Sequence, residues 1–149
     1  MNQGGMTLIV KQTARLVSGF ITVFGIHIAL TGHLTPGGGF AGGVILAAAA
    51  VLIVLSFGGA YCSRLLTGPA CHIADSAGAM MFLLVAILGY LVGGFFVSFL
   101  PQGNLFHLVS GGTMPLSNLA ILVKVGAGLA GGFLALSAFR LASGAKEGD

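Results

Sequence analysis

Charged residues are scarce in this chain, and their scarcity excludes a water-soluble fold. Only 6% of the 149 residues are charged, whereas 56% are hydrophobic. Soluble domains carry about 25% charged residues, and so small a supply cannot cover a water-facing surface. A lipid bilayer is the solvent that fits this composition. We therefore expect an integral membrane protein that forms a single domain over residues 1–149.

Cysteines and basic clusters are also too few for several classes of function. Cys62 and Cys71 are not spaced as a close metal-ligand pair, and we interpret them as free thiols in apolar surroundings. The net charge of +3 comes without a basic patch, which argues against nucleic-acid binding. The sequence shows no nucleophile–base pair, no metal cluster and no paired carboxylates, so we predict no catalytic residue, no metal and no cofactor.

What the chain has instead is a series of long apolar segments. At ~1.5 Å per residue, about 20 residues cross a hydrocarbon core of ~30 Å. The predicted fold class is an all-α integral membrane protein with four transmembrane helices, over residues 11–31, 40–57, 77–100 and 118–141. Lys11 and Arg15 before the first apolar run imitate a secretory signal peptide, but no A-x-A site follows and the apolar character resumes at once.

A glycine-rich link, residues 32–43, joins the first helix to the second. It contains a literal G-x-G-x-x-G at Gly37, Gly39 and Gly42. A dinucleotide site needs a strand before this motif and an acidic residue ~20 positions later, and here a membrane helix precedes it. We interpret the link as a tight turn in which Pro36 fixes φ and the glycines allow positive φ. A small anion-binding nest of backbone amides is the alternative.

The basic residues fall on one side of the predicted topology. With four spans, the N-terminus, the middle loop and the C-terminus share a side, and that side carries Lys11, Arg15, Arg64, Arg140 and Lys146. The two links on the other side carry neither lysine nor arginine. The positive-inside rule then predicts a plasma-membrane protein with both termini in the cytoplasm.

Pairs of glycines one helical turn apart predict close contact between helices. The pairs are Gly39 and Gly43, Gly89 and Gly93, and Gly128 and Gly132. Such a stripe lacks side chains and lets another backbone approach. We interpret the surplus of stripes as surface for other membrane subunits, with packing among the four helices as the alternative.

The glycine-rich link closely resembles the signature of the MnhB/MrpB family. The matching residues are Gly32, His33, Pro36, Gly37, Gly38, Gly39, Phe40, Gly42 and Gly43, and a Gly-Gly-Thr-Met-Pro-Leu stretch at residues 111–116 precedes the last helix. Members of this family are small membrane subunits of multisubunit Na+/H+ antiporters. The same module occurs in membrane-bound hydrogenases and sulfur-reducing complexes, which are relatives of respiratory complex I.

The resemblance implies a non-catalytic subunit of either an Mrp-type Na+/H+ antiporter or a hydrogenase-type respiratory complex. Its implied partners are large antiporter-like subunits and small Mrp-type subunits in the bilayer, and the transported ions are Na+ and H+. The chain departs from the antiporter members in one respect, because residues 118–126 hold no acidic residue. The basic residue in that stretch, Lys124, is more similar to the hydrogenase-type branch.

Lys124 is the first candidate for an ion or proton path. A lysine near the middle of a membrane costs at least ~2.5 kcal/mol on insertion scales, so it usually has a partner or lines a wet path. We expect that partner to be a carboxylate or water on a neighbouring subunit, because the predicted helices offer no acidic residue at that depth. Snorkelling of the side chain to the nearer interface is the alternative.

The remaining path candidates are three histidines and one aspartate. His27 lies in the outer part of the first helix and His33 just beyond it, where histidine can relay protons or donate a hydrogen bond between helices. His72 and Asp75 lie near the start of the predicted third helix. We expect Asp75 with Ser76 to cap that helix, with proton uptake from the cytoplasm as the alternative.

A second function also fits a small membrane protein. A self-sufficient channel or transporter built as a homo-oligomer would need a polar stripe along one helix, and the predicted spans show only isolated polar residues. The sequence therefore favours an accessory subunit of an ion-translocating complex.

Overall fold

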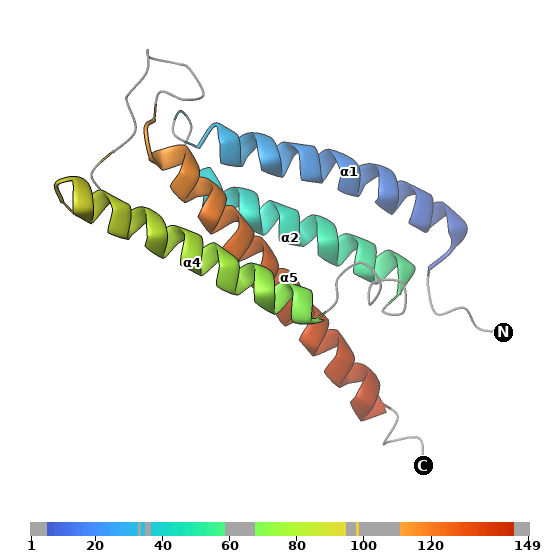
Figure 1. The fold of residues 1–149 in the computed structure, drawn as a ribbon. Helices are drawn as coiled ribbons and strands as arrows, with labels where there is room; N and C mark the ends of the chain where they lie inside the picture. Colours follow the sequence, from blue (N-terminus) through green and yellow to red (C-terminus); the bar gives the residue numbers. More distant parts are fainter. Residues whose placement is uncertain are drawn as a thin grey trace.

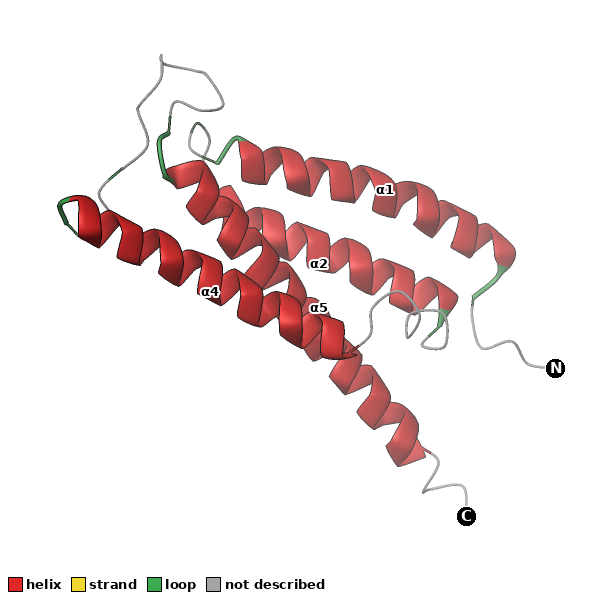
Figure 2. Cartoon of the chain, viewed as in Figure 1, coloured by secondary structure: helices red, strands yellow, loops and turns green. Residues whose placement is uncertain are grey.

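The computed structural model describes residues 6–32, 34, 37–58, 68–94, 98 and 111–144, the side chains of 138–144 excepted. These ranges contain the helices α1 (Leu8–Leu30), α2 (Gly38–Phe57), α4 (Gly68–Val92) and α5 (Met114–Gly144), and no strand (Figure 2). All are long and apolar enough to cross a membrane, α5 over Met114–Ser137. The predicted all-α membrane fold is confirmed.

Helix α5 is the central element of the fold. Helix α1 packs on α2, α2 packs on α5, and α5 packs on α4, with a smaller contact between α1 and α5. Figure 1 shows α5 crossing obliquely beside the other helices. The start of α1, the end of α2, the start of α4 and the end of α5 lie toward one side, as four alternating spans require (Figure 1).

Glycines on α2 allow this helix to lie close to two neighbours. A methyl group added at Gly42 would lie 2.8 Å from the Gly25 carbonyl oxygen of α1. At Gly43 it would lie 2.9 Å from Cβ of Val125 and 3.0 Å from the Leu122 carbonyl oxygen, both on α5. These distances are shorter than ordinary carbon contacts, so only glycine fits. The predicted close contact at the Gly39–Gly43 pair is thus made within the chain.

The bounds of α4 differ from those expected for the third helix. It begins at Gly68 rather than at residue 77, and its helical residues end at Val92 rather than at residue 100. Pro69 lies in its first turn, where the missing N–H of proline costs nothing. The end of the helix precedes Gly93 and Gly94, and glycine is a poor helix former.

The last helix also begins earlier than expected. It starts at Met114 rather than at residue 118, because Pro115 lies in the first turn instead of breaking the helix. Before it, Gly112 has a φ of 58°, and the Met114 N–H donates to the Gly111 carbonyl oxygen at 3.1 Å. Smaller differences occur at α1 and α2, which start at Leu8 and Gly38 rather than at residues 11 and 40.

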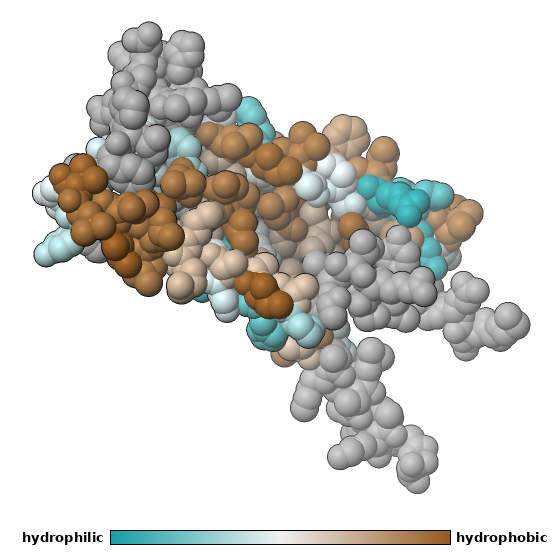
Figure 3. Space-filling view, in the orientation of Figure 1, coloured by the Kyte–Doolittle hydropathy of each residue, from teal (hydrophilic) through white to brown (hydrophobic). Residues whose placement is uncertain are grey.

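Large apolar side chains cover much of the described surface. Figure 3 shows hydrophobic residues along the faces of the helices, with hydrophilic residues toward the start of α1. Phe20 of α1 and Leu91 of α4 are 71% and 75% exposed. At the start of α1 the Arg15 guanidinium lies 5.7 Å from the centre of the Phe57 ring, a distance at which cation–π attraction operates. This surface is suited to lipid and to other membrane helices.

Candidate functional site

An ion pair joins α4 to α5 inside the membrane-spanning region. Nζ of Lys124 donates to Oδ1 of Asp75 at 2.9 Å. The two side chains remain 48% and 39% exposed, respectively. Asp75 and Lys124 are 49 positions apart in the sequence, so the packing of α4 on α5 brings them together.

The pair lies well away from the ends of both helices. At ~1.5 Å per residue, Lys124 is about 15 Å from the start of α5, and Asp75 is about 10 Å from the start of α4. With the two spans centred on a hydrocarbon core ~30 Å thick, these distances place both groups within the core. Each charge at such a depth is costly alone, and the other charge offsets part of that cost.

Two glycines create the space in which this pair forms. A methyl group at Gly78 would lie 2.8 Å from the Lys124 amide nitrogen and 2.9 Å from the Ala120 carbonyl oxygen. The absence of a side chain at Gly78 therefore lets α4 approach the backbone of α5. On α5, a methyl group at Gly128 would lie 3.5 Å from Oδ1 of Asp75. The carboxylate thus lies over Gly128, one turn after Lys124.

Two expectations about these charges were wrong. Asp75 lies within α4 and not at its N-terminus, because the helix begins at Gly68, so Asp75 and Ser76 do not cap it. Lys124 has a carboxylate partner within this chain, where the predicted helices offered none. Both errors have one cause. The third helix was predicted to begin at residue 77, so Asp75 was expected in a loop outside the membrane.

The other path candidates are not part of the ion pair. His72 is exposed on α4, one turn before Asp75. His27 is exposed on α1, which packs mainly on α2, and its carbonyl oxygen accepts a hydrogen bond from Oγ1 of Thr31 at 2.8 Å. His33 lies outside the described residues. The roles expected of these histidines remain predictions.

The described part of the glycine-rich link lies directly against the start of α5. Gly37 and Gly38 have φ values of 137° and 59°, the positive values that the sequence predicted for the link. A methyl group at Gly39 would overlap the backbone of Asn118, and one at Gly38 would lie 3.1 Å from its Oδ1. Gly38, Gly39, Gly42 and Gly43 are all buried, and Phe40 is exposed. Pro36 lies outside the described residues, so its effect on the turn stays a prediction.

Asn118 is a residue whose importance the sequence reasoning missed. In the sequence it belongs only to the stretch 118–126, which holds no acidic residue. In the structure, a methyl group at Gly32 would lie 2.8 Å from its Nδ2, so Asn118 lies next to the start of the link as well as next to Gly38 and Gly39. The polar residues Ser117 and Asn118 in the first turns of an apolar helix are the signal that could have indicated this contact.

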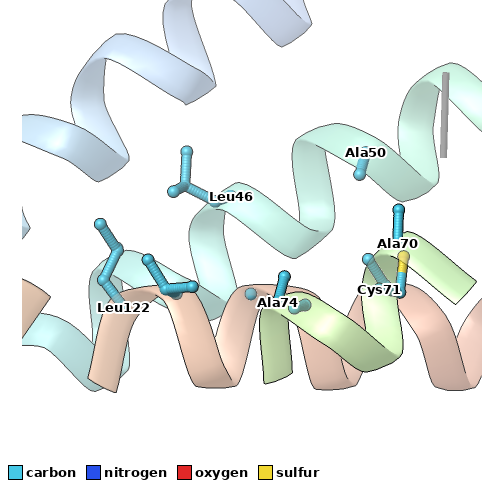
Figure 4. Close-up of a pocket in the computed structure, with 10 residues that line it drawn as sticks. Leu46, Ala50, Ala70, Cys71, Ala74 and Leu122 are labelled. Carbon is cyan, nitrogen blue, oxygen red and sulfur yellow. The ribbon is translucent and has the colours of Figure 1, made fainter. Parts of the chain in front are cut away.

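An apolar groove lies between α2 and α4, with α5 as its floor. Its volume is about 380 Å³. Figure 4 shows the lining residues, which come from these three helices: Leu46 and Ala50; Ala70, Cys71 and Ala74; and Leu122, Val123, Gly126, Ala127 and Ala130. Cys71 is a buried free thiol. Cys62 lies outside the described residues. The groove uses other positions of α4 and α5 than the ion pair does.

Comparison with known proteins places this arrangement in a family. A family model described as a domain related to the MnhB subunit of Na+/H+ antiporter matches residues 9–131. A subunit of the Na+/H+ antiporter of Bacillus subtilis is 32% identical, over 66% of this chain and 68% of its own length. An uncharacterised protein of Methanocaldococcus jannaschii is 33% identical, over 85% of this chain and 50% of its own length.

A solved structure has a similar fold. It is a chain of the membrane-bound sulfane sulfur reductase, an archaeal respiratory membrane complex, with a TM-score of 0.72 and 31% sequence identity. The match covers 87% of this chain and 56% of the other. The chain therefore spans about half the length of this structure and of the archaeal relative. The family match covers most of the four-helix unit, and the chain belongs to the MnhB family.

Proposed function

We propose that this chain is a non-catalytic membrane subunit of a multisubunit module that couples Na+ and H+ translocation. The parent complex is either an Mrp-type antiporter or a respiratory complex of the membrane-bound hydrogenase and sulfur-reductase kind. The observation that carries the proposal is the Asp75–Lys124 pair, an ion pair exposed within the membrane-spanning region of an MnhB-family chain. Its partners are large antiporter-like and small Mrp-type membrane subunits.

Charges within a membrane are rare and mark ion paths, proton relays or polar contacts. In this proposal Asp75 and Lys124 form the mid-membrane step, and His72 supports proton uptake one turn closer to the start of α4. His27 lies in the last turn of α1, and His33 follows that helix in the sequence. The basic residues Lys11 and Arg15 orient the start of α1 toward the cytoplasm by the positive-inside rule.

Neutralising Lys124 tests the role of the pair. The variant Lys124→Gln keeps a long polar side chain and removes the charge that faces Asp75. We expect each assembled complex to lose at least tenfold in its rate of sodium-dependent proton transport, equivalent to about 1.4 kcal/mol in the limiting step. The measurement is sodium-driven pH change in inverted membrane vesicles, with the amount of assembled complex determined on native gels.

The matched control is Lys11→Gln, which removes the same charge at the start of α1, away from the pair, while Arg15 remains to orient that end of the helix. This variant should transport at the unmodified rate. If each assembled complex with Lys124→Gln transports as fast as one with Lys11→Gln, the pair has no part in coupling.

A further inference from the structure

The exposed edge of the Asp75–Lys124 pair needs a polar neighbour. The bond to Oδ1 of Asp75 uses one of the three donors on the lysine ammonium, and the second carboxylate oxygen can accept further hydrogen bonds. Nearly half of the Lys124 side chain and more than a third of the Asp75 side chain are exposed. Lipid tails supply neither donors nor acceptors, so contact with lipid would leave these groups unsatisfied.

The surface beside this edge is open to a helix. Gly128 and Gly132 follow Lys124 at intervals of four residues and therefore lie on the same face of α5. A methyl group at Gly132 would meet no atom within 4 Å, and one at Gly128 would meet only Oδ1 of Asp75, within the part of the chain that the structure describes. Neighbouring helices of the chain occupy the space beside the glycines on α2. No helix of the described chain occupies the space beside Gly128 and Gly132.

A small-residue stripe beside a polar group is the surface on which membrane helices associate. Small residues let two backbones approach, and polar side chains then hydrogen-bond across the interface. An acyl chain could fill the glycine stripe but could not bond to the ion pair. The pair is neutral as a whole, so it suits a neutral side chain that both donates and accepts, such as an amide or a hydroxyl.

We infer that Gly128, Gly132 and the exposed edge of Asp75–Lys124 form the docking surface for one transmembrane helix of another subunit of the same complex. That helix crosses α5 at the two glycines and presents a neutral hydrogen-bonding side chain to the ion pair. This inference rests on the proposed function, because it takes the chain to be part of a multisubunit assembly. It adds the place and the chemistry of one contact.

Photo-crosslinking at two open glycines tests this surface. A benzophenone amino acid is placed at Gly132 or, as the control, at Gly19 of α1, where an added methyl group also meets nothing within 4 Å. The assembled complex is irradiated in native membranes, and the adducts are identified by mass spectrometry. We expect position 132 to crosslink to one other subunit of the complex, and to give at least tenfold more of that adduct than position 19.

A second variant measures the strength of the contact. The Cβ atom of Gly132→Leu would meet no described atom within 4 Å, whereas the leucine side chain would obstruct a helix at the docking surface. We expect it to lower the recovery of the crosslinked subunit about tenfold after mild detergent extraction, equivalent to about 1.4 kcal/mol, whereas Gly19→Leu leaves recovery unchanged.

Several outcomes would overturn the inference. Adducts of position 132 with lipid alone, or with a second copy of this chain, would show a different occupant. Full recovery of the subunit from Gly132→Leu, or equal losses from both leucine variants, would show that this face is not the contact. The proposed function fails separately, if the unmodified chain purifies without any other subunit.

Discussion

Lys124 and Asp75 show how a membrane protein can hold charges at depth. Each residue alone would face a cost of about 2.5–3.5 kcal/mol at the centre of a helix on insertion scales. At 2.9 Å their opposite charges attract and offset part of this cost, and Gly78 and Gly128 provide the space for the contact. The pair is therefore a property of the α4–α5 contact and not of either helix alone.

The pairing predicts that a double variant is less harmful than either single variant. Asp75→Asn leaves a lone lysine in the membrane, and Lys124→Gln leaves a lone aspartate. The combination Asp75→Asn with Lys124→Gln leaves two neutral amides that can bond to one another. We expect each single variant to lower the amount of assembled subunit about tenfold, and the double variant to restore most of it.

The measurement is the amount of this chain in the native complex, relative to total membrane protein. Sodium-coupled transport by the double variant should stay low, because neither group then carries a charge. Additive losses in the double variant would show that the two side chains act independently.

This pair also shows what the sequence could predict at the residue scale. The composition around Lys124 correctly indicated a costly charge that needs a partner. The partner was expected on another chain because the third helix was predicted to begin at residue 77, and Asp75 stands with Gly68 and Pro69 in the segment before it. Proline is tolerated in the first turn of a helix, so α4 extends through both of them and carries Asp75 into the membrane.

At the scale of the elements, glycine positions determine which helices meet. Gly42 faces α1, Gly39 and Gly43 face α5, and Gly78 joins α4 to α5. The sequence predicted such stripes from spacing alone, but spacing did not indicate which stripe is filled within the chain. That depends on the order of packing, in which α5 lies between α2 and α4.

Gly78 is the position at which we expect a single added methyl group to disrupt the ion pair most. In Gly78→Ala the new carbon would lie 2.8 Å from the Lys124 amide nitrogen, which is backbone and cannot move alone. We expect α4 to shift away from α5, with a loss of about 1–3 kcal/mol in stability. The temperature at which half of the purified complex loses this subunit should fall.

The control for this variant is Gly132→Ala, which adds the same methyl group where the chain itself offers open space. The docking helix proposed above tolerates one methyl group better than a leucine, so the loss should be smaller than for Gly78→Ala. An unchanged midpoint for Gly78→Ala would contradict the close approach of α4 to α5.

At the scale of the whole molecule, the four alternating spans fix which ends share a side. The basic residues at the start of α1 then predict that this side is cytoplasmic. Leu8 and Met114 are suited to test the orientation, because they lie at opposite sides and are 76% and 63% exposed. Each is replaced by cysteine in a chain that carries Cys62→Ser and Cys71→Ala.

A membrane-impermeant maleimide added to intact cells should label Met114→Cys and not Leu8→Cys. Disrupted cells should give labelling of both variants. Labelling of Leu8→Cys alone in intact cells would reverse the predicted orientation.

The family and the membrane fold could be predicted from the sequence because apolar length and a specific glycine-rich signature are local features. The packing of the helices could not be predicted from the sequence, because the apolar groove over α5 and the ion pair depend on contacts between distant segments. These contacts leave polar groups and glycines exposed within the membrane. Such a surface suits a subunit of an assembly better than an independent transporter.

Sodium flux in liposomes tests this account most directly. The purified chain alone and the whole complex are reconstituted in parallel, and uptake of labelled sodium is followed under a pH gradient. The account predicts uptake by the complex and only the background rate of empty liposomes for the chain alone. Sodium uptake by the chain alone at the rate of the complex would contradict it.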